Sequence, residues 1–318
     1  MGRTGYEGKA AEAVKKRGRL AAVLILLVIP VTMVACSLIF QQTNYMMASL
    51  LVIVYTMIPF FMVFEKRKPK AREIVLIAMM TAVTVCVHMV FHITLPIQIG
   101  TALVIISGIA MGPEAGFLVG ALARFVCNFY MGQGQWTPWQ MFAWGLMGFL
   151  AGLIFAQKKS AETKHTDPTK SIVLNSIMGP VLMVLFAEII AYITILISPG
   201  EDSTFAGWRI YAFGAAGLII GGIFGRKSLK ADKYTVTVFT FLTIFMIYGG
   251  IMNVATMFTS MGIPGGMELS LNTLRLLFIS GLPMDFSHAA TASICIFIMG
   301  EPMIKKIERI KIKYGIYR

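Results

Sequence analysis

Long apolar runs alternate with short polar segments along almost the whole chain of 318 residues. Most runs approach the roughly 20 residues that a helix needs to cross the hydrocarbon core of a bilayer. Lipid offers no hydrogen-bond partners to the backbone, so each run is predicted to be a helix. Ten runs are expected, at 20–38, 46–64, 74–92, 98–112, 115–130, 138–156, 172–197, 209–225, 234–259 and 283–300. The pattern predicts an all-α polytopic membrane protein.

Two parts of the pattern depart from simple spans. The runs 98–112 and 115–130 are short, and a tight turn at 111–114 joins them, so we expect them to be tilted or shielded by neighbouring helices. The segment 268–280 has apolar residues at helical spacing but is short and polar. It is therefore predicted to be an outer amphipathic or re-entrant piece.

Composition agrees with a membrane protein. Hydrophobic residues make up 57% of the chain, charged residues 14%, and the mean hydropathy is +0.76, too apolar for a water-soluble globule of this length. The four cysteines lie singly in different apolar runs, without the paired spacing of a zinc site or a disulfide framework. We therefore expect neither a structural metal nor a bridge.

Positive charge fixes the expected orientation. Of 28 Lys and Arg residues, all but three lie in the alternate gaps 1–20, 65–72, 157–171, 226–233 and 303–318. The remaining gaps carry none, which predicts cytoplasmic N and C termini in a multi-pass protein of the plasma membrane. The basic segments flank apolar spans without interleaved aromatic residues, so the net charge of +13 indicates anionic lipid and no nucleic-acid partner.

The polybasic gap also suggests a division of the chain, because Pro69 within it is unsuited to a continuing helix. Residues 1–72 are expected to form a basic N-terminus, two extra helices and a linker. Residues 73–302 are expected to form the helical membrane core, and residues 303–318 a basic cytoplasmic tail.

An uncharged outer loop is rich in amide and aromatic side chains. Aromatic rings offer stacking faces, amides offer paired donors and acceptors, and glycines allow close approach of the backbone. The candidate ligand-binding residues are Asn128, Gln133, Gln135, Trp136, Trp139 and Gln140. The alternative is an aromatic belt at the membrane interface followed by a turn. Three amides in one short loop favour binding, because headgroup anchoring does not use them.

A second candidate region begins at Gly281. Pro283 suits the first turn of a helix, and Asp285 suits the positive end of the helix dipole. His288 is three residues further on and shares a helix face with Asp285. Both are candidate ligand-binding residues at the level of the outer loop. A carboxylate that only caps the helix is the alternative.

Buried charge gives a third candidate. Arg124 lies inside the run 115–130 and Glu188 inside 172–197, and charges at such depth need partners. Arg124 is expected to pair with Glu188 or Asp285, either as a structural ion pair or as the floor of a polar cavity. His88 and His92 could line the same cavity or bind a metal, although two histidines without a third ligand favour a core role.

The sequence contains no phosphate-binding loop and no hydrolase or metalloprotease motif, so catalysis by the chain itself is not expected. Ala78 and Ala82 lie one turn apart near the cytoplasmic end of their helix, which allows close helix contact, within the chain or with a partner.

Four segments carry a family resemblance: Pro96 to Thr101, Gly112 to Phe117, Gly132 to Met141 and Gly281 to Asp285. Together they resemble the substrate-binding S components of energy-coupling factor (ECF) vitamin transporters. The resemblance is densest over 72–156 and returns at 281–309. Ala78 and Ala82 match the A-x-x-x-A contact signature of that family.

The resemblance implies a non-catalytic subunit of an ABC-type importer, without a cofactor of its own. Such a subunit captures a vitamin from outside, while a transmembrane coupling protein (T component) and two cytoplasmic ATPases drive release. It implies that Ala78 and Ala82 face the coupling protein and that the outer loop helps to form the binding site. The W-T-P-W-Q stretch most resembles cobalamin-type members, which makes cobalamin the predicted substrate. The family's usual six helices leave 157–262 without an assigned counterpart.

Two other functions remain open from the residues alone. A solitary ion-coupled transporter would use Arg124, Glu188 and His288 as its pathway. A membrane enzyme acting on a lipid-linked substrate would use Asp285 and His288 as acid and base.

Overall fold

The computed structural model describes residues 20, 23–39, 51, 54–55, 58, 71–94, 98–156, 168–198, 208–224, 232–260, 266–268 and 270–316. Every regular element in these ranges is helical, in agreement with the predicted all-α class. Apart from 46–64, which lies largely outside the described residues, each expected apolar run falls on a helix.

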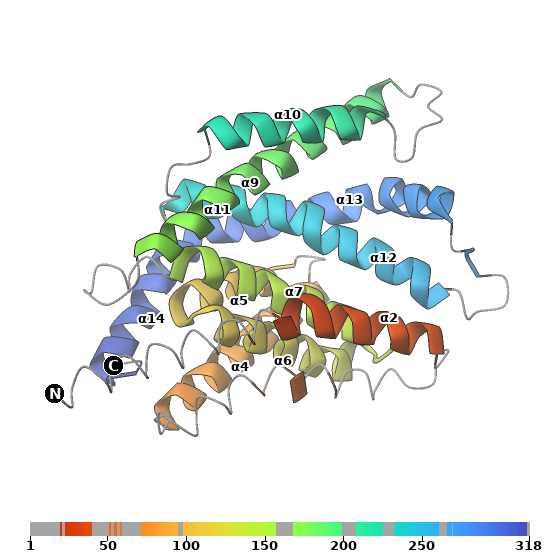
Figure 1. Ribbon diagram of the computed structural model, residues 1–318. Helices are drawn as coiled ribbons and strands as arrows, with labels where there is room; N and C mark the ends of the chain where they lie inside the picture. The colour runs from red at the N-terminus through yellow and green to blue at the C-terminus, as the bar shows by residue number, and fades with distance from the viewer. Residues whose placement is uncertain are drawn as a thin grey trace.

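One half of the core is an up-and-down arrangement of neighbouring helices (Figure 1). It consists of α4 (Ala71–Thr94), α5 (Gly100–Met111), α6 (Pro113–Met131) and α7 (Thr137–Ala151), which the π-helical segment η2 (Gly152–Ala156) extends. Gly112 and Gly132 end α5 and α6 with φ of 103°, a conformation that glycine tolerates. Pro113 and Pro138 then stand in the first turns of α6 and α7, where a missing N–H costs nothing.

The other half is a long antiparallel pair. Its first member runs through α11 (Lys233–Leu242), the π-helical η3 (Thr243–Tyr248) and α12 (Gly249–Ser260). The second runs through α13 (Leu271–Cys295), the π-helical η4 (Ile296–Gly300) and α14 (Glu301–Lys313). The pair packs on α5 and α7, as Figure 1 shows. We call the end of the bundle where α6 meets α7 the loop end, and the opposite end the α14 end.

The remaining helices lie at the edges. The π-helical η1 (Leu24–Val28) and α2 (Ile29–Ile39) form one rod, and α2 touches α7 and α12. A hairpin of α9 (Pro168–Ile197) and α10 (Trp208–Phe224) packs tightly on itself, and α9 contacts the core at α11, η2 and η3. In Figure 1 this hairpin lies on the far side of α11–α13 from α4 and α6.

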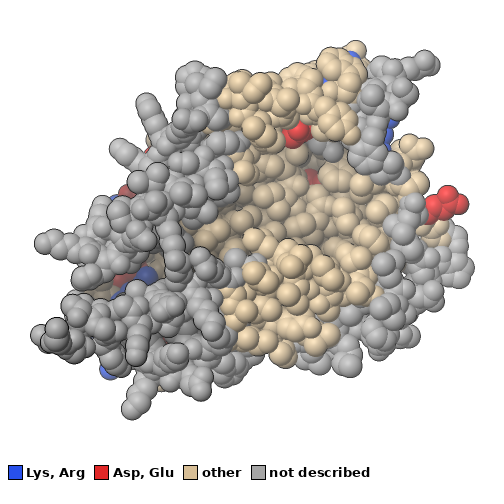
Figure 2. Space-filling view, in the orientation of Figure 1, with Lys and Arg blue, Asp and Glu red and all other residues tan. Residues whose placement is uncertain are grey.

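Four helical runs in the described part are long and apolar enough to cross a membrane, by length and composition: 71–92, 137–155, 233–260 and 272–313. On the face shown in Figure 2 the described surface is largely uncharged, with a few acidic and basic atoms, mostly toward its edges. Such a surface suits contact with lipid tails.

The sequence-based expectation for 268–280 and Pro283 is wrong. The helix α13 begins at Leu271, where the Ser270 hydroxyl caps it by accepting from the Thr273 amide at 3.1 Å, and it continues through Pro283. Membrane helices tolerate such a proline because neighbouring groups satisfy the freed carbonyl. Asp285 therefore lies in mid-helix and does not cap a helix start.

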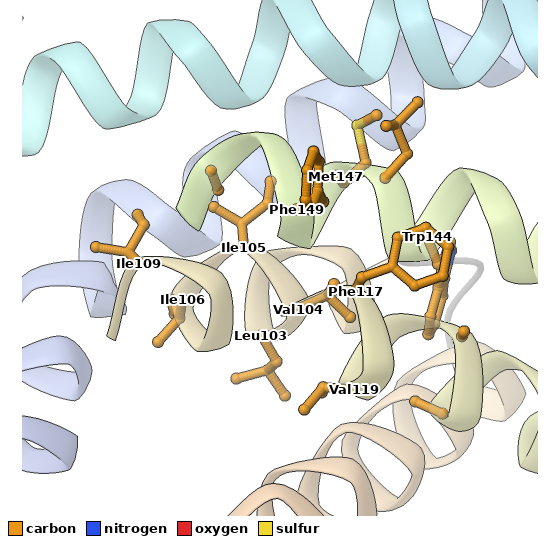
Figure 3. Packing of buried hydrophobic residues seen from close by; sticks show 14 of the residues in the cluster. Leu103, Val104, Ile105, Ile106, Ile109, Phe117, Val119, Trp144, Met147 and Phe149 are labelled. Atoms are coloured by element: carbon orange, nitrogen blue, oxygen red, sulfur yellow. The ribbon is translucent and has the colours of Figure 1, made fainter. Parts of the chain in front are cut away.

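The core is centred on α5, all of whose residues are buried, as expected for a short helix shielded by its neighbours. Figure 3 shows side chains from α5, α6 and α7 interleaved around it. Glycines bring these backbones together: a Cβ on Gly108 would lie 2.0 Å from the Gly148 carbonyl oxygen, and one on Gly148 would lie 2.4 Å from the Gly116 oxygen. In lipid, close packing of this kind is what holds helices together.

Candidate functional site

Arg124, on the inner face of α6, is the centre of a buried polar cluster. Only 6% of the residue is exposed. Its Nε donates to the Gln140 Oε1 of α7 at 2.9 Å, and its Nη1 donates to the His88 Nε2 of α4 at 3.2 Å. The guanidinium carbon also lies 5.3 Å from the centre of the Trp144 ring. One cation thus connects α4, α6 and α7.

The expected ion pairs of Arg124 do not form. No carboxylate of the described residues pairs with it. Asp285 accepts from the Asn253 Nδ2 of α12 at 3.2 Å. Glu188 lies in the edge hairpin, where a Cβ on Gly214 would approach its Oε1 to 2.4 Å. Burying a cation without a counter-ion is costly, so the cluster favours a ligand that brings acceptor atoms.

His88 adds a donor to the cluster. The arginine can only donate, so His88 Nε2 must accept, and the neutral ring carries its proton on Nδ1. This Nδ1 is fully buried and has no partner among the described residues. The His92 ring stacks on the His88 ring, with the ring centroids 5.4 Å apart. The Nδ1 of His92 is likewise buried without a described partner. No group of three potential metal ligands occurs in the described part of the chain.

The loop end of the cluster is held by Asn128 and Thr137. The Asn128 amide nitrogen donates to Gln140 Oε1 at 2.9 Å and to Thr137 Oγ1 at 3.1 Å, and the Gly134 N–H donates to the same hydroxyl at 3.0 Å. Asn128 is 1% exposed, yet its Oδ1 has no partner among the described residues. It is a buried acceptor beside the buried cation.

The other loop residues take different places. Gln133 donates to the Phe125 carbonyl at 3.3 Å, and its buried Oε1 has no partner among the described residues. Gln135 is half-buried and Trp136 is 44% exposed. Trp139 is buried and stacks on Phe258 of α12, with ring centres 5.9 Å apart, so its ring holds α7 against α12.

The α13 side of the interior is also polar. The buried His288 shares a hydrogen bond of 2.8 Å between its Nε2 and the Thr101 hydroxyl of α5. Tyr248, at the end of η3, contacts the His288 ring edge-on at 4.5 Å. Asp285, one turn away, is close to Gly249, where a Cβ would lie 2.6 Å from its carboxyl carbon. This side therefore connects α5, η3, α12 and α13.

Sequence reasoning found Arg124, Asn128, Gln140 and His288, which lie in or beside this polar interior, but it missed several partners. These are Thr101, Thr137, Trp144, Tyr248 and Asn253. Trp144, Tyr248 and Asn253 are single polar or amphipathic residues inside apolar runs, whereas Thr101 and Thr137 lie in two of the segments that carry the family resemblance.

Ala78 and Ala82 lie on an exposed face of α4, together with Val75, Met79 and Val83. The described part of the chain leaves this face uncovered. Small residues on such a face allow close contact with another transmembrane helix.

Residues 68–212, less than half of the chain, match the family model of the ECF-type riboflavin transporter S component. The matched stretch contains α4 to α7, which supply the Arg124 cluster, and ends inside α10. No curated protein and no solved structure matches the chain. The finding supports the S-component resemblance, and it names riboflavin where the loop sequence had suggested cobalamin.

Proposed function

We propose that this chain is the substrate-binding S component of an ECF-type vitamin importer and that its ligand is riboflavin or a closely related flavin. The family match over α4 to α7 supports the class and the vitamin. The observation that carries the proposal is the buried Arg124, which has no counter-ion among the described residues, beside buried polar atoms of His88 and Asn128 without described partners.

The chemistry of a flavin ring complements these groups. One edge of the ring system carries two carbonyl oxygens on either side of an N–H. The carbonyls can accept from Arg124 and from His88 Nδ1, and the N–H can donate to the Asn128 or Gln133 amide oxygen. Cobalamin is a larger ligand with many peripheral amides, and this small set of free atoms suits a single planar edge better.

Import requires partners in this proposal, because the sequence has no nucleotide-binding motif. A T component and two ATPases would supply the driving force. The exposed Ala78 and Ala82 of α4 are the proposed contact with the T component, because small residues let helices approach closely in a membrane.

Titration of the purified chain with riboflavin and with cobalamin, both without ATP, tests the ligand. We expect one riboflavin per chain and no cobalamin binding. Arg124→Gln should weaken riboflavin binding. Arg275→Gln is its matched control, because Arg275 is an exposed arginine of α13 toward the loop end. Binding of cobalamin in place of riboflavin would refute the ligand assignment, and binding of neither would remove the basis of the site.

A transport measurement tests the class. Uptake of labelled riboflavin should require co-expression of a T component and ATPases. Uptake into vesicles that contain this chain alone, driven by an imposed ion gradient, would support a solitary transporter instead.

A further inference from the structure

The C-terminal part of the chain contains a helical run that is longer than a bilayer requires. Helices α13, η4 and α14 follow one another without a break, and the run Asn272–Lys313 has 42 residues. At about 1.5 Å per residue it is roughly twice as long as the hydrocarbon core is thick. Part of it must lie outside the hydrocarbon, and α14 is the charged part. Its basic residues are Lys305, Lys306, Arg309, Lys311 and Lys313.

Side-chain contacts fix the depth of α14. Figure 1 shows α14 at a steep angle to α13, crossing the end of the bundle. Lys311 donates through Nζ to the carbonyl of Ala110, at the end of α5. Arg72, at the start of α4, donates to the Tyr314 carbonyl at 2.9 Å. The helix therefore lies within a side chain's length of the start of α4 and the end of α5, which the orientation predicted from the charge pattern puts at the headgroups of the cytoplasmic leaflet.

The two faces of α14 differ. Ile307 and, just beyond the helix, Ile316 are buried, and the neighbouring apolar residues Met303, Ile304 and Ile310 pack on the core. The outward face is formed by exposed residues, namely Lys305, Lys306, Arg309, Ile312, Lys313 and Tyr314. We call this set the outward face of α14.

Most of the charge on the outward face has no counter-ion among the described residues. Lys305 pairs with Glu301 at 2.5 Å, so that cation is compensated. Lys306, Arg309 and Lys313 make no ion pair with a described residue. Ile312 is 67% exposed and Tyr314 is 45% exposed beside them. Cations next to exposed apolar and aromatic side chains are typical of helices that lie in the membrane interface.

We infer that Lys306, Arg309 and Lys313, the cations of the outward face without a described counter-ion, bind anionic phospholipid headgroups of the cytoplasmic leaflet. These three cations complement the phosphate charge, and Ile312 and Tyr314 offer apolar surface to the upper part of the acyl chains. The headgroup depth favours lipid over a soluble acidic protein, and free phosphate would make no use of the apolar residues. The inference rests on the cytoplasmic orientation that the charge pattern predicts, and it does not depend on which vitamin is bound.

Native mass spectrometry of the full-length chain in detergent tests the inference, with an equimolar mixture of phosphatidylglycerol and phosphatidylcholine as the probe. We expect the parent protein to retain phosphatidylglycerol preferentially. The triple variant K306Q/R309Q/K313Q should lose preference by about fivefold for each cation removed, because a surface cation contributes about 1 kcal/mol. Phosphatidylcholine adducts should not change.

Two control variants isolate the effect. E301Q/K305Q removes the compensated ion pair without changing net charge and should keep the lipid preference. K306R/R309K/K313R keeps every charge and should also keep it. Thermal unfolding of all variants in phosphatidylcholine alone checks that each is folded.

Three outcomes would overturn the inference. The triple variant could keep the parent's lipid ratio, which would assign the preference to other basic segments. Inorganic phosphate could displace the lipid at equal concentration, which would indicate a free-anion site. A soluble polyglutamate could displace phosphatidylglycerol from the parent but not bind the triple variant, which would make the face a protein-docking surface.

Discussion

Replacing Arg124 by lysine separates the shape of the buried cation from its charge. Arginine donates from Nε to Gln140 and from Nη1 to His88, and both atoms belong to one planar guanidinium group. The same guanidinium also lies near the ring of Trp144. Lysine keeps the charge but has a single nitrogen on a flexible stem, so it cannot reproduce both contacts and the stacking. Either His88 or Gln140 then loses a charged donor.

These contacts orient the guanidinium, and the expected size follows from the bond that Arg124 is proposed to donate to a carbonyl of the ligand. A hydrogen bond from a charged group is worth roughly 1.5–3 kcal/mol, so loss of one such bond to the ligand should weaken binding by about 10- to 150-fold. Arg124→Gln also removes the charge and should weaken binding at least as much. Riboflavin affinity is measured by quenching of its fluorescence or by calorimetry on purified protein.

Control measurements make this prediction refutable. Arg275→Lys, at an exposed position of α13, should bind as the parent does. Thermal unfolding in the absence of ligand shows whether Arg124→Lys is folded. Parent-like affinity in folded Arg124→Lys and Arg124→Gln would refute the assignment of the ligand to the Arg124 cluster.

Three further predictions concern packing and partners. Ala78→Leu and Ala82→Leu should abolish uptake by the assembled transporter while riboflavin binding to the isolated chain stays unchanged; retained uptake in both would remove the contact-face assignment. Gly148→Val should destabilise the fold by about 1–3 kcal/mol in a denaturation assay, because a Cβ there would lie 2.4 Å from the Gly116 oxygen, and unchanged stability would contradict the close packing. Thr101→Val should lower stability by about 1–3 kcal/mol, because it leaves the buried His288 Nε2 without its partner, and a parent-like unfolding midpoint would show that this bond contributes nothing.

The helices other than α14 were predictable because each lies on a contiguous apolar run, a local property of the sequence; the charged α14 falls in the segment expected to be a basic tail. The start of α13 was not predictable from Pro283. Proline favours the first turn of a helix because it has no N–H to donate, and this preference is strong in water-soluble helices. Inside a membrane bundle Pro283 is tolerated in mid-helix. The Ser270 cap, thirteen residues upstream of Pro283, was the better local signal.

The site was predictable in part for the same reason. Asn128 and Gln140 lie in a short segment with an unusual concentration of amides, so composition revealed them, although the structure places them in α6 and α7 on either side of a shorter loop than expected. The partners of Arg124 are set by helix packing, which sequence spacing does not encode, and the expected pairing with Glu188 was wrong because α9 lies at the edge of the bundle. A charge-based search favours acidic partners, whereas the neighbours of Arg124 are an amide and a neutral imidazole.

The most direct test of the central claim is to purify the chain alone in detergent, denature it, and identify by mass spectrometry any small molecule released. The account predicts a flavin in stoichiometric amount from the parent protein and a much reduced amount from Arg124→Gln. A corrinoid in place of the flavin would contradict the ligand assignment, and a flavin retained equally by Arg124→Gln would contradict the site.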